Sequence, residues 1–137
     1  MKNDKGFSLV ELIIVIAIMA VLVGILAPIF IRYVEQSRRS RDIQTADQIR
    51  EAFLADIAEG STVGTGSVQV EIDAAHLPGT INETPTVAGH VFAAGGTFTA
   101  VYNADTNEVG VYVTQDYDGS QSYNLTTEAG IAAYKAA

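Results

Sequence analysis

The chain has 137 residues and a formal net charge of −8, from 16 acidic and 8 basic side chains. This length is typical of a single domain, and the acidic balance argues against nonspecific binding of nucleic acid by the monomer. The sequence contains no cysteine, which excludes both a disulfide and a thiolate metal site.

The first element in chain order is a long apolar segment. From Phe7 to Ile31 it has 25 residues, of which only Glu11 carries a strong charge. At roughly 1.5 Å per residue, a helix of this length crosses a hydrocarbon core of about 30 Å. A secretory signal has a shorter apolar region and a small-x-small cleavage site, and neither feature fits here. A protease that cuts near this terminus must therefore cut before the apolar segment, on the cytoplasmic side, and leave that segment on the product.

A specific motif stands at the start of this segment. A short basic leader ends at a glycine, which is followed by a phenylalanine, a serine and then a glutamate (Gly6, Phe7, Ser8 and Glu11). The motif resembles the class III signal of type IV pilins and pseudopilins. The resemblance implies that a prepilin peptidase cuts between Gly6 and Phe7, and that Phe7 then becomes N-methylated.

Glu11 lies inside the membrane-length segment. A carboxylate at membrane depth costs about 2.5–3.5 kcal/mol on insertion scales, so it normally has a partner. Cleavage after Gly6 creates an α-amine at Phe7, one helical turn from Glu11. The resemblance implies that Glu11 pairs with this amine of a neighbouring subunit during assembly. The alternative is that Glu11 lies near the lipid headgroups and has no specific partner.

Two residues weaken the apolar helix. Pro28 removes one intrahelical hydrogen bond and clashes with the preceding turn, at a cost of about 3 kcal/mol in a water-exposed helix, and Gly24 adds up to roughly 1 kcal/mol. We therefore expect a kinked or locally opened helix between them. Pro28 also lies where pilins commonly carry a kinking proline. A simple kink, which neighbouring helices tolerate in membranes, is the alternative to local opening.

The helical pattern continues beyond Ile31. Apolar residues recur at spacings of three and four, and charged residues stand between them. Gly60 then supplies a C-cap. The sequence thus predicts one helix over residues 7–59, whose second half packs under a small domain. The apolar positions are Ile43, Ala46, Ile49, Phe53 and Ile57, and the charged positions between them are Arg41, Asp42, Asp47, Arg50 and Glu51.

Four arginines follow the apolar segment: Arg32, Arg38, Arg39 and Arg41. By the positive-inside rule, these four arginines alone would place the C-terminal side of the segment in the cytoplasm. The two lysines of the leader would instead place the N-terminal side there. The resemblance to pilins favours a cytoplasmic leader, because the prepilin peptidase of this family cuts on the cytoplasmic side of the membrane. The arginines then contact anionic lipid headgroups before assembly, or acidic residues of neighbouring subunits afterwards. A solvated charged face is the alternative.

After Gly60 the composition changes to Gly, Thr, Val and Tyr. Residues 68–72, 98–102 and 109–113 alternate apolar and polar side chains, which predicts strands with one buried face. Residues 103–107 favour a hairpin turn, so the last two strands should pair antiparallel. We expect one more short strand at 123–125, a terminal helical turn over 127–137 that Gly130 weakens, and mainly loop from 73 to 96 with Val91-Phe92 as a candidate short strand.

The remaining motifs are weak. Asp116, Asp118 and Ser120 have the oxygen spacing that begins many calcium loops, but the glycine and glutamate that complete an EF-hand loop are replaced, so we expect a tight turn. The two histidines, His76 and His90, lie in loop-rich stretches. No nucleophile elbow, zinc-protease motif or phosphate loop is present in the sequence. We therefore expect no enzymatic activity and no cofactor.

Together these features predict an α+β fold, with a long N-terminal helix packed on a small antiparallel sheet. The expected parts are a leader (residues 1–6), a transmembrane and assembly helix (7–31), an amphipathic half-helix (32–59) and a β-rich head (60–137).

The resemblance implies a single-pass protein of the bacterial cytoplasmic membrane that the pilus assembly machinery polymerises into an extracellular homo-oligomeric filament, for adhesion, motility or DNA uptake. A pseudopilin of a type II secretion or competence machine shares this start and remains an alternative. A monomeric membrane-tethered binding module is a third hypothesis, but a tether needs neither the Gly6-Phe7 junction nor Glu11.

Overall fold

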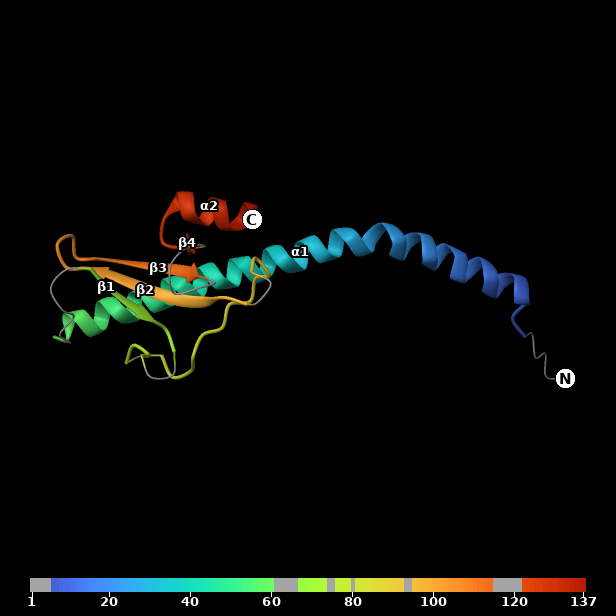
Figure 1. Ribbon diagram of the computed structural model, residues 1–137. Coiled ribbons are helices and arrows are strands. Elements are labelled where there is room, and N and C mark those ends of the chain that lie inside the picture. Colours follow the sequence, from blue (N-terminus) through green and yellow to red (C-terminus); the bar gives the residue numbers. More distant parts are fainter. Residues whose placement is uncertain (1–5, 61–66, 74–75, 80, 93–94, 115–121) are drawn as a thin grey trace. The chain divides into compact units, whose positions relative to one another are not determined.

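The computed structural model describes residues 6–60, 67–73, 76–79, 81–92, 95–114 and 122–137 (Figure 1). The chain forms two compact units, residues 1–34 and residues 35–137. The calcium candidates Asp116, Asp118 and Ser120 lie outside the described residues.

Helix α1 (Leu9–Ala58, 50 residues) belongs to both units. It starts two residues later and ends one residue earlier than predicted. Its end is set by Gly60, which takes a φ of +91°, a conformation that suits glycine, and donates its N–H to the Ile57 carbonyl at 3.1 Å.

The helix is continuous at Gly24 and Pro28. The expected local opening between these residues is therefore not found. Proline removes one N–H donor, and the other hydrogen bonds of the helix can still form around it. The kink at this position stays a prediction.

The second unit contains a four-stranded antiparallel sheet in the order β1-β2-β3-β4. The strands are β1 (Ser67–Glu71), β2 (Thr97–Asn103), β3 (Glu108–Thr114) and β4 (Ser122–Asn124). The predicted hairpin connects β2 and β3. Its tip is stabilised by Asn107, which takes a positive φ of 55° and accepts a 2.9 Å hydrogen bond from the Tyr102 hydroxyl.

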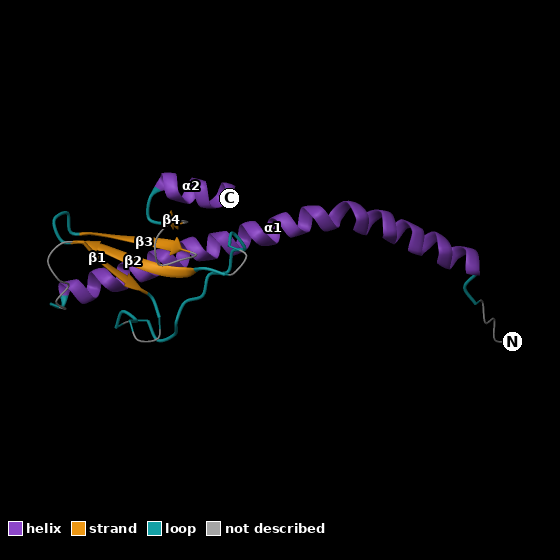
Figure 2. Cartoon of the chain, in the orientation of Figure 1, coloured by secondary structure: helices purple, strands orange, loops and turns teal. Residues whose placement is uncertain are grey.

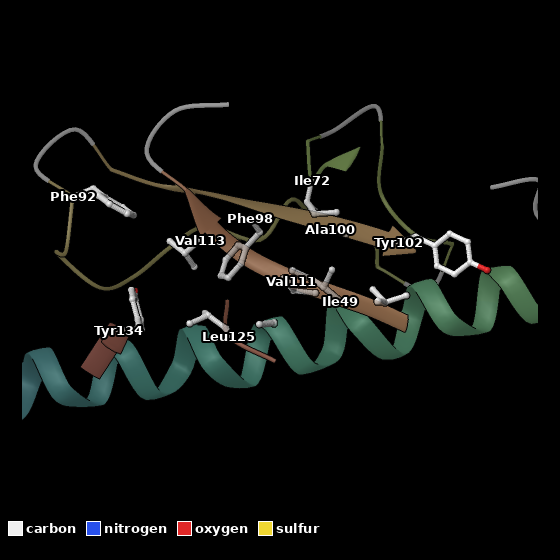
Figure 3. Close-up of a cluster of buried hydrophobic side chains, with 12 residues drawn as sticks. Ile49, Ile72, Phe92, Phe98, Ala100, Tyr102, Val111, Val113, Leu125 and Tyr134 are labelled. Carbon is white, nitrogen blue, oxygen red and sulfur yellow. The ribbon is translucent and has the colours of Figure 1, made fainter. Parts of the chain in front are cut away.

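The core lies between the second half of α1 and one face of this sheet. Figure 3 shows Ile49 of α1 below Phe98 and Ala100 of β2 and Val111 and Val113 of β3. All five side chains are at most 1% exposed. The apolar positions of β2 and β3 predicted to face the core are all buried, which confirms the period of two for those residues, although Thr99 and Thr114 between and after them are buried as well.

The C-terminal helix α2 (Glu128–Ala136) packs on β4. Thr127 caps it, since the Thr127 Oγ1 accepts a 3.2 Å hydrogen bond from the Gly130 N–H. The fold requires a glycine at position 130 although glycine disfavours helices, because a Cβ at this position would overlap the carbonyl oxygen of Asn124. The expected terminal turn is therefore a nine-residue helix.

The described residues of the connection from β1 to β2 are mainly loop, as expected (Figure 2). Val91 and Phe92 form no strand, which corrects that part of the prediction. Phe92 instead lies 5% exposed in the core, with its ring centroid 6.0 Å from that of Tyr123. Phe92 is therefore apolar because its ring is buried in the core, and not because it belongs to a β-strand.

Candidate functional site

The first unit presents an uncovered apolar surface. The large apolar side chains from Phe7 to Tyr33 are between 45% and 94% exposed. An 18-residue window of α1 has a mean hydropathy of 3.1, and none of this window is buried within the chain. Among the described residues, α1 is the helix that is long and apolar enough to cross a membrane. Such a surface needs lipid or another protein to cover it.

The N-terminus of α1 is capped by Ser8 and Glu11. The Glu11 Oε2 accepts a 2.8 Å hydrogen bond from the Ser8 backbone N–H, and the Ser8 Oγ accepts a 3.3 Å hydrogen bond from the Val10 N–H. This is a variant of the capping box, in which the serine Oγ accepts from the second N–H of the helix and not from the third, and it satisfies two N–H groups that the helix itself leaves free. The Glu11 carboxylate thus has a partner within its own chain before any neighbour approaches.

The sequence contains the signal for this cap, a serine followed three residues later by a glutamate, but the prediction of a helix from residue 7 did not take it into account. Glu11 also lines an open hollow of about 480 Å³ together with Phe7, Leu12 and Val15. The structure therefore brings the predicted assembly residues Phe7 and Glu11 to one apolar surface.

A second polar cluster, which we call the clasp, consists of Glu35, Arg39, Asp42 and Tyr134. At its centre the Asp42 carboxylate is fully buried. Asp42 Oδ1 accepts a 2.7 Å hydrogen bond from the Ala88 N–H. Its Oδ2 accepts hydrogen bonds from the Gly89 N–H at 2.8 Å and from the Tyr134 hydroxyl at 2.6 Å. These three donors offset the cost of removing the carboxylate from water.

Arg39 connects α1 to the end of α2. Its Nη1 donates to the carbonyls of Tyr134 and Lys135 at 2.9 and 3.0 Å, and its Nε donates to Glu35 Oε1 at 3.1 Å. The last carbonyls of a helix lack partners within the helix, so Arg39 acts as a cap for α2. The guanidinium carbon also lies 5.9 Å from the Tyr134 ring centroid.

Charge and burial shift two pKa values in the clasp. Burial raises the pKa of Glu35, but the hydrogen bond from the His90 backbone N–H and the Arg39 guanidinium outweigh it, so the net shift is downward. Burial, followed by the hydrogen bond to Asp42, raises the pKa of Tyr134 far above its ordinary value. Tyr134 therefore stays a hydrogen-bond donor, and Glu35 stays an acceptor, across the neutral range.

The structure separates the four arginines. Arg39 is largely buried and uses its donors within the chain, while Arg38 Nη1 lies 2.6 Å from His90 Nδ1. The side chains of Arg32 and Arg41 are exposed and make no hydrogen bond or ion pair with other described residues. Of these four arginines, Arg32 and Arg41 are thus the two whose side chains are free to contact other molecules.

Asp42 was predicted on the charged face of the helix, and the structure corrects this. Asp42 continues the row of Ala46 and Ile49, at spacings of four and three, and all three are fully buried. The spacing is visible in the sequence, but the charge of Asp42 favoured an exposed position. Its burial depends on N–H donors that lie 46 and 47 residues further along the chain.

Comparisons with known proteins agree with the N-terminal motif and extend the similarity over most of the chain. The profile of a family described as "Prokaryotic N-terminal methylation motif" matches residues 1–27. "Fimbrial protein Q" of Moraxella bovis is 29% identical over 143 aligned residues, which cover 96% of this chain and 91% of that protein. "Type IV wide pilus major component PilA4" of Thermus thermophilus is 29% identical over 126 residues, covering 83% and 90% of the two chains.

"Type IV major fimbrial protein FimA" of Dichelobacter nodosus is 37% identical over 61 residues, 44% of this chain and 39% of that protein. No solved structure matches the chain significantly. The chain therefore carries the N-terminal methylation motif and is similar over most of its length to type IV fimbrial proteins, which are structural proteins.

Proposed function

We propose that this protein is the major subunit of a type IV pilus and polymerises through the first half of α1. The observation that carries the proposal is the apolar surface from Phe7 to Tyr33, which the chain itself leaves uncovered. Near-full-length similarity to a fimbrial protein and to a major pilus component supports it. A filament of many copies covers this surface with identical helices.

Before assembly, the same surface is covered by lipid. The length and hydropathy of α1 suit a single span of the bacterial cytoplasmic membrane, with the leader on the cytoplasmic side. A prepilin peptidase cuts between Gly6 and Phe7, Phe7 is N-methylated, and the pilus machinery transfers the subunit to the growing extracellular filament. The match to the N-terminal methylation motif over residues 1–27 supports this order of events.

Glu11 sets the axial register of the subunits. Apolar packing holds helices together but sets their axial offset poorly, because many offsets bury a similar area. A carboxylate and an amine in a low-dielectric bundle are each costly when unpaired, so one offset is favoured. The incoming Phe7 amine then replaces the Ser8 N–H as the partner of Glu11.

The exposed arginines Arg32 and Arg41 extend the contacts between subunits. The sequence from residue 61 onward contains eight acidic residues and one basic residue, Lys135, so the head is acidic. Attraction between this acidic surface and the two arginines supports side-by-side packing of subunits.

Electron microscopy of sheared cell-surface material, probed with an antibody against this chain, tests the proposal. Filaments labelled along their whole length are expected. Label at the tip alone would identify a minor pilin. A chain that stays in the membrane fraction with Met1 intact would instead support the monomeric tether, and a processed chain without surface filaments would support the pseudopilin alternative.

A further inference from the structure

A polar trough crosses the outer face of the sheet. Ala100 and Val111 point into the core. Side chains alternate between the two faces of a sheet, so the adjacent residues Val101 and Gly110 lie on the opposite face. Val101 and Gly110 are directly paired and form the floor of the trough. Its volume is about 420 Å³, within the range of roughly 300–1,000 Å³ that is typical of small-molecule sites.

Two further cross-strand pairs line the trough. Asn103 and Glu108 lie on one side of the floor, and Tyr112 and Asn124 lie on the other. The missing side chain of Gly110 leaves the space between them. A Cβ at Gly110 would lie 3.1 Å from Tyr112 Cε2 and 3.6 Å from Asn124 Nδ2, so the tyrosine ring and the amide nitrogen border the empty position.

The trough offers an aromatic ring together with several hydrogen-bonding groups. Asn124 Oδ1 is occupied by the backbone N–H and hydroxyl of Thr126, which leaves its Nδ2 as the group beside Gly110. Glu108 supplies acceptors, and Arg50, at the edge, supplies donors. Within the described residues, the Tyr112 hydroxyl makes no hydrogen bond, so it is free to bind a ligand.

The charges of the trough restrict the ligand. It holds one carboxylate and one guanidinium, so its formal charge is balanced. One carboxylate is too few for a protein-bound cation, and the same carboxylate repels an anion. An apolar ligand would leave the amide and carboxylate groups without partners. A neutral molecule with many hydroxyls and one apolar ring face satisfies both the polar groups and the aromatic ring.

We propose that the trough between Asn103–Glu108 and Tyr112–Asn124 binds a neutral saccharide. One face of a sugar ring packs on Tyr112, and its hydroxyls donate to Glu108 and accept from Asn124 Nδ2 and Arg50. This function is separate from filament assembly through α1, since the groups involved lie on the outer face of the sheet and at its edge.

Saturation-transfer difference NMR on sheared filaments tests the proposal, because it detects weak ligands of large particles. The probes are lactose, cellobiose and N,N′-diacetylchitobiose, with sialyllactose as the charged counterpart of lactose. We expect transfer to at least one neutral disaccharide. Tyr112→Ala should lower the apparent affinity by roughly tenfold or more, as for loss of an aromatic anchor. Tyr112→Phe, which keeps the ring, should retain most of it.

Gly110→Val provides an independent test, since it fills the floor without removing a polar group and a β-branched residue suits a strand. It should also lose binding, while Glu83→Gln, an exposed change in the connection between β1 and β2 that does not line the trough, should not. Filament integrity is checked by electron microscopy, and if one trough variant fails to assemble the other decides the question. No transfer to any neutral probe, transfer to sialyllactose alone, or unchanged transfer in the assembled trough variants overturns the proposal.

Discussion

The Tyr134 hydroxyl donates a 2.6 Å hydrogen bond to Oδ2 of Asp42, 92 residues earlier in the chain. Both side chains are fully buried. The bond connects the last turn of α2 to α1, and Arg39 supports it by holding the carbonyls of the same turn. The position of the C-terminal helix is therefore determined by polar contacts as much as by apolar packing.

Tyr134→Phe should lower the free energy of unfolding by about 1–3 kcal/mol, because it removes one of the three donors to a buried carboxylate. Urea denaturation of a head fragment comprising residues 33–137 measures the change. Tyr112→Phe is the matched control, since it removes an unbonded hydroxyl and should change stability little. Equal stability of the two variants would show that the bond to Asp42 contributes nothing.

The head fragment itself should be a folded monomer. Residues 35–137 form one compact unit, and they retain Ala46 and Ile49, the fully buried apolar residues of α1. Circular dichroism should show both helix and strand, and sedimentation should give the monomer mass. An unfolded fragment would contradict the packing of the second half of α1 on the sheet as one unit.

The clasp should make the head sensitive to acid through Glu35. The pKa of Glu35 is lowered in the folded protein, so the ionised carboxylate contributes to the free energy of unfolding. This contribution is fully present above the pKa of Glu35 in the unfolded chain, near the ordinary value of 4.5. It disappears as the pH falls through the lower pKa of the folded protein. The stability difference between wild type and Glu35→Gln should thus be present at neutral pH and shrink below about pH 4.5. Glu83→Gln, which removes an exposed carboxylate in the connection between β1 and β2, controls for net charge. A difference that grows in acid would contradict the downward shift.

Gly130→Ala should destabilise the head although alanine favours helices by up to about 1 kcal/mol over glycine. The new methyl group would overlap the Asn124 carbonyl, so α2 or β4 must shift. Ala132→Gly, at an exposed position of the same helix, should cost only the propensity difference. Thermal unfolding of both variants gives the comparison, and a stabilised Gly130→Ala protein would refute the close approach.

Substitutions of Glu11 can separate its two roles. Glu11→Ala removes both the cap and the charge, whereas Glu11→Gln keeps an acceptor for the Ser8 N–H and removes only the charge. If register depends on charge pairing, both variants should be processed normally and both should assemble poorly, as measured by immunoblots of cell-associated and sheared fractions. Normal filaments from the glutamine variant would leave only the capping role.

Cleavage between Gly6 and Phe7 should appear directly in the mass of the N-terminal peptide from filaments. It should begin with Phe7 and carry one additional methyl group. Replacing Gly6 with a bulky residue should block processing, because a side chain at that position obstructs the approach of the peptidase to the backbone. A filament peptide that begins at Met1 would contradict both expectations.

Local patterns in the sequence predicted the elements well. The period of two in β2 and β3 and the spacing of Ala46 and Ile49 in α1 each report which side of an element is buried, and the structure agrees. Asp42 and Gly130 were misjudged because their environments are supplied by residues far along the chain or on another element. A propensity or charge at one position does not indicate which donor or carbonyl the fold will bring next to it.

Tyr134 follows its partner Asp42 by 92 residues, so the clasp can close only after most of the second unit has been synthesised. Until the two side chains meet, the second unit holds a carboxylate whose burial is incompletely compensated. We expect a protein whose Tyr134 cannot reach Asp42 to be degraded by proteases faster than the intact one, so that closure of the clasp acts as a check that this unit has folded.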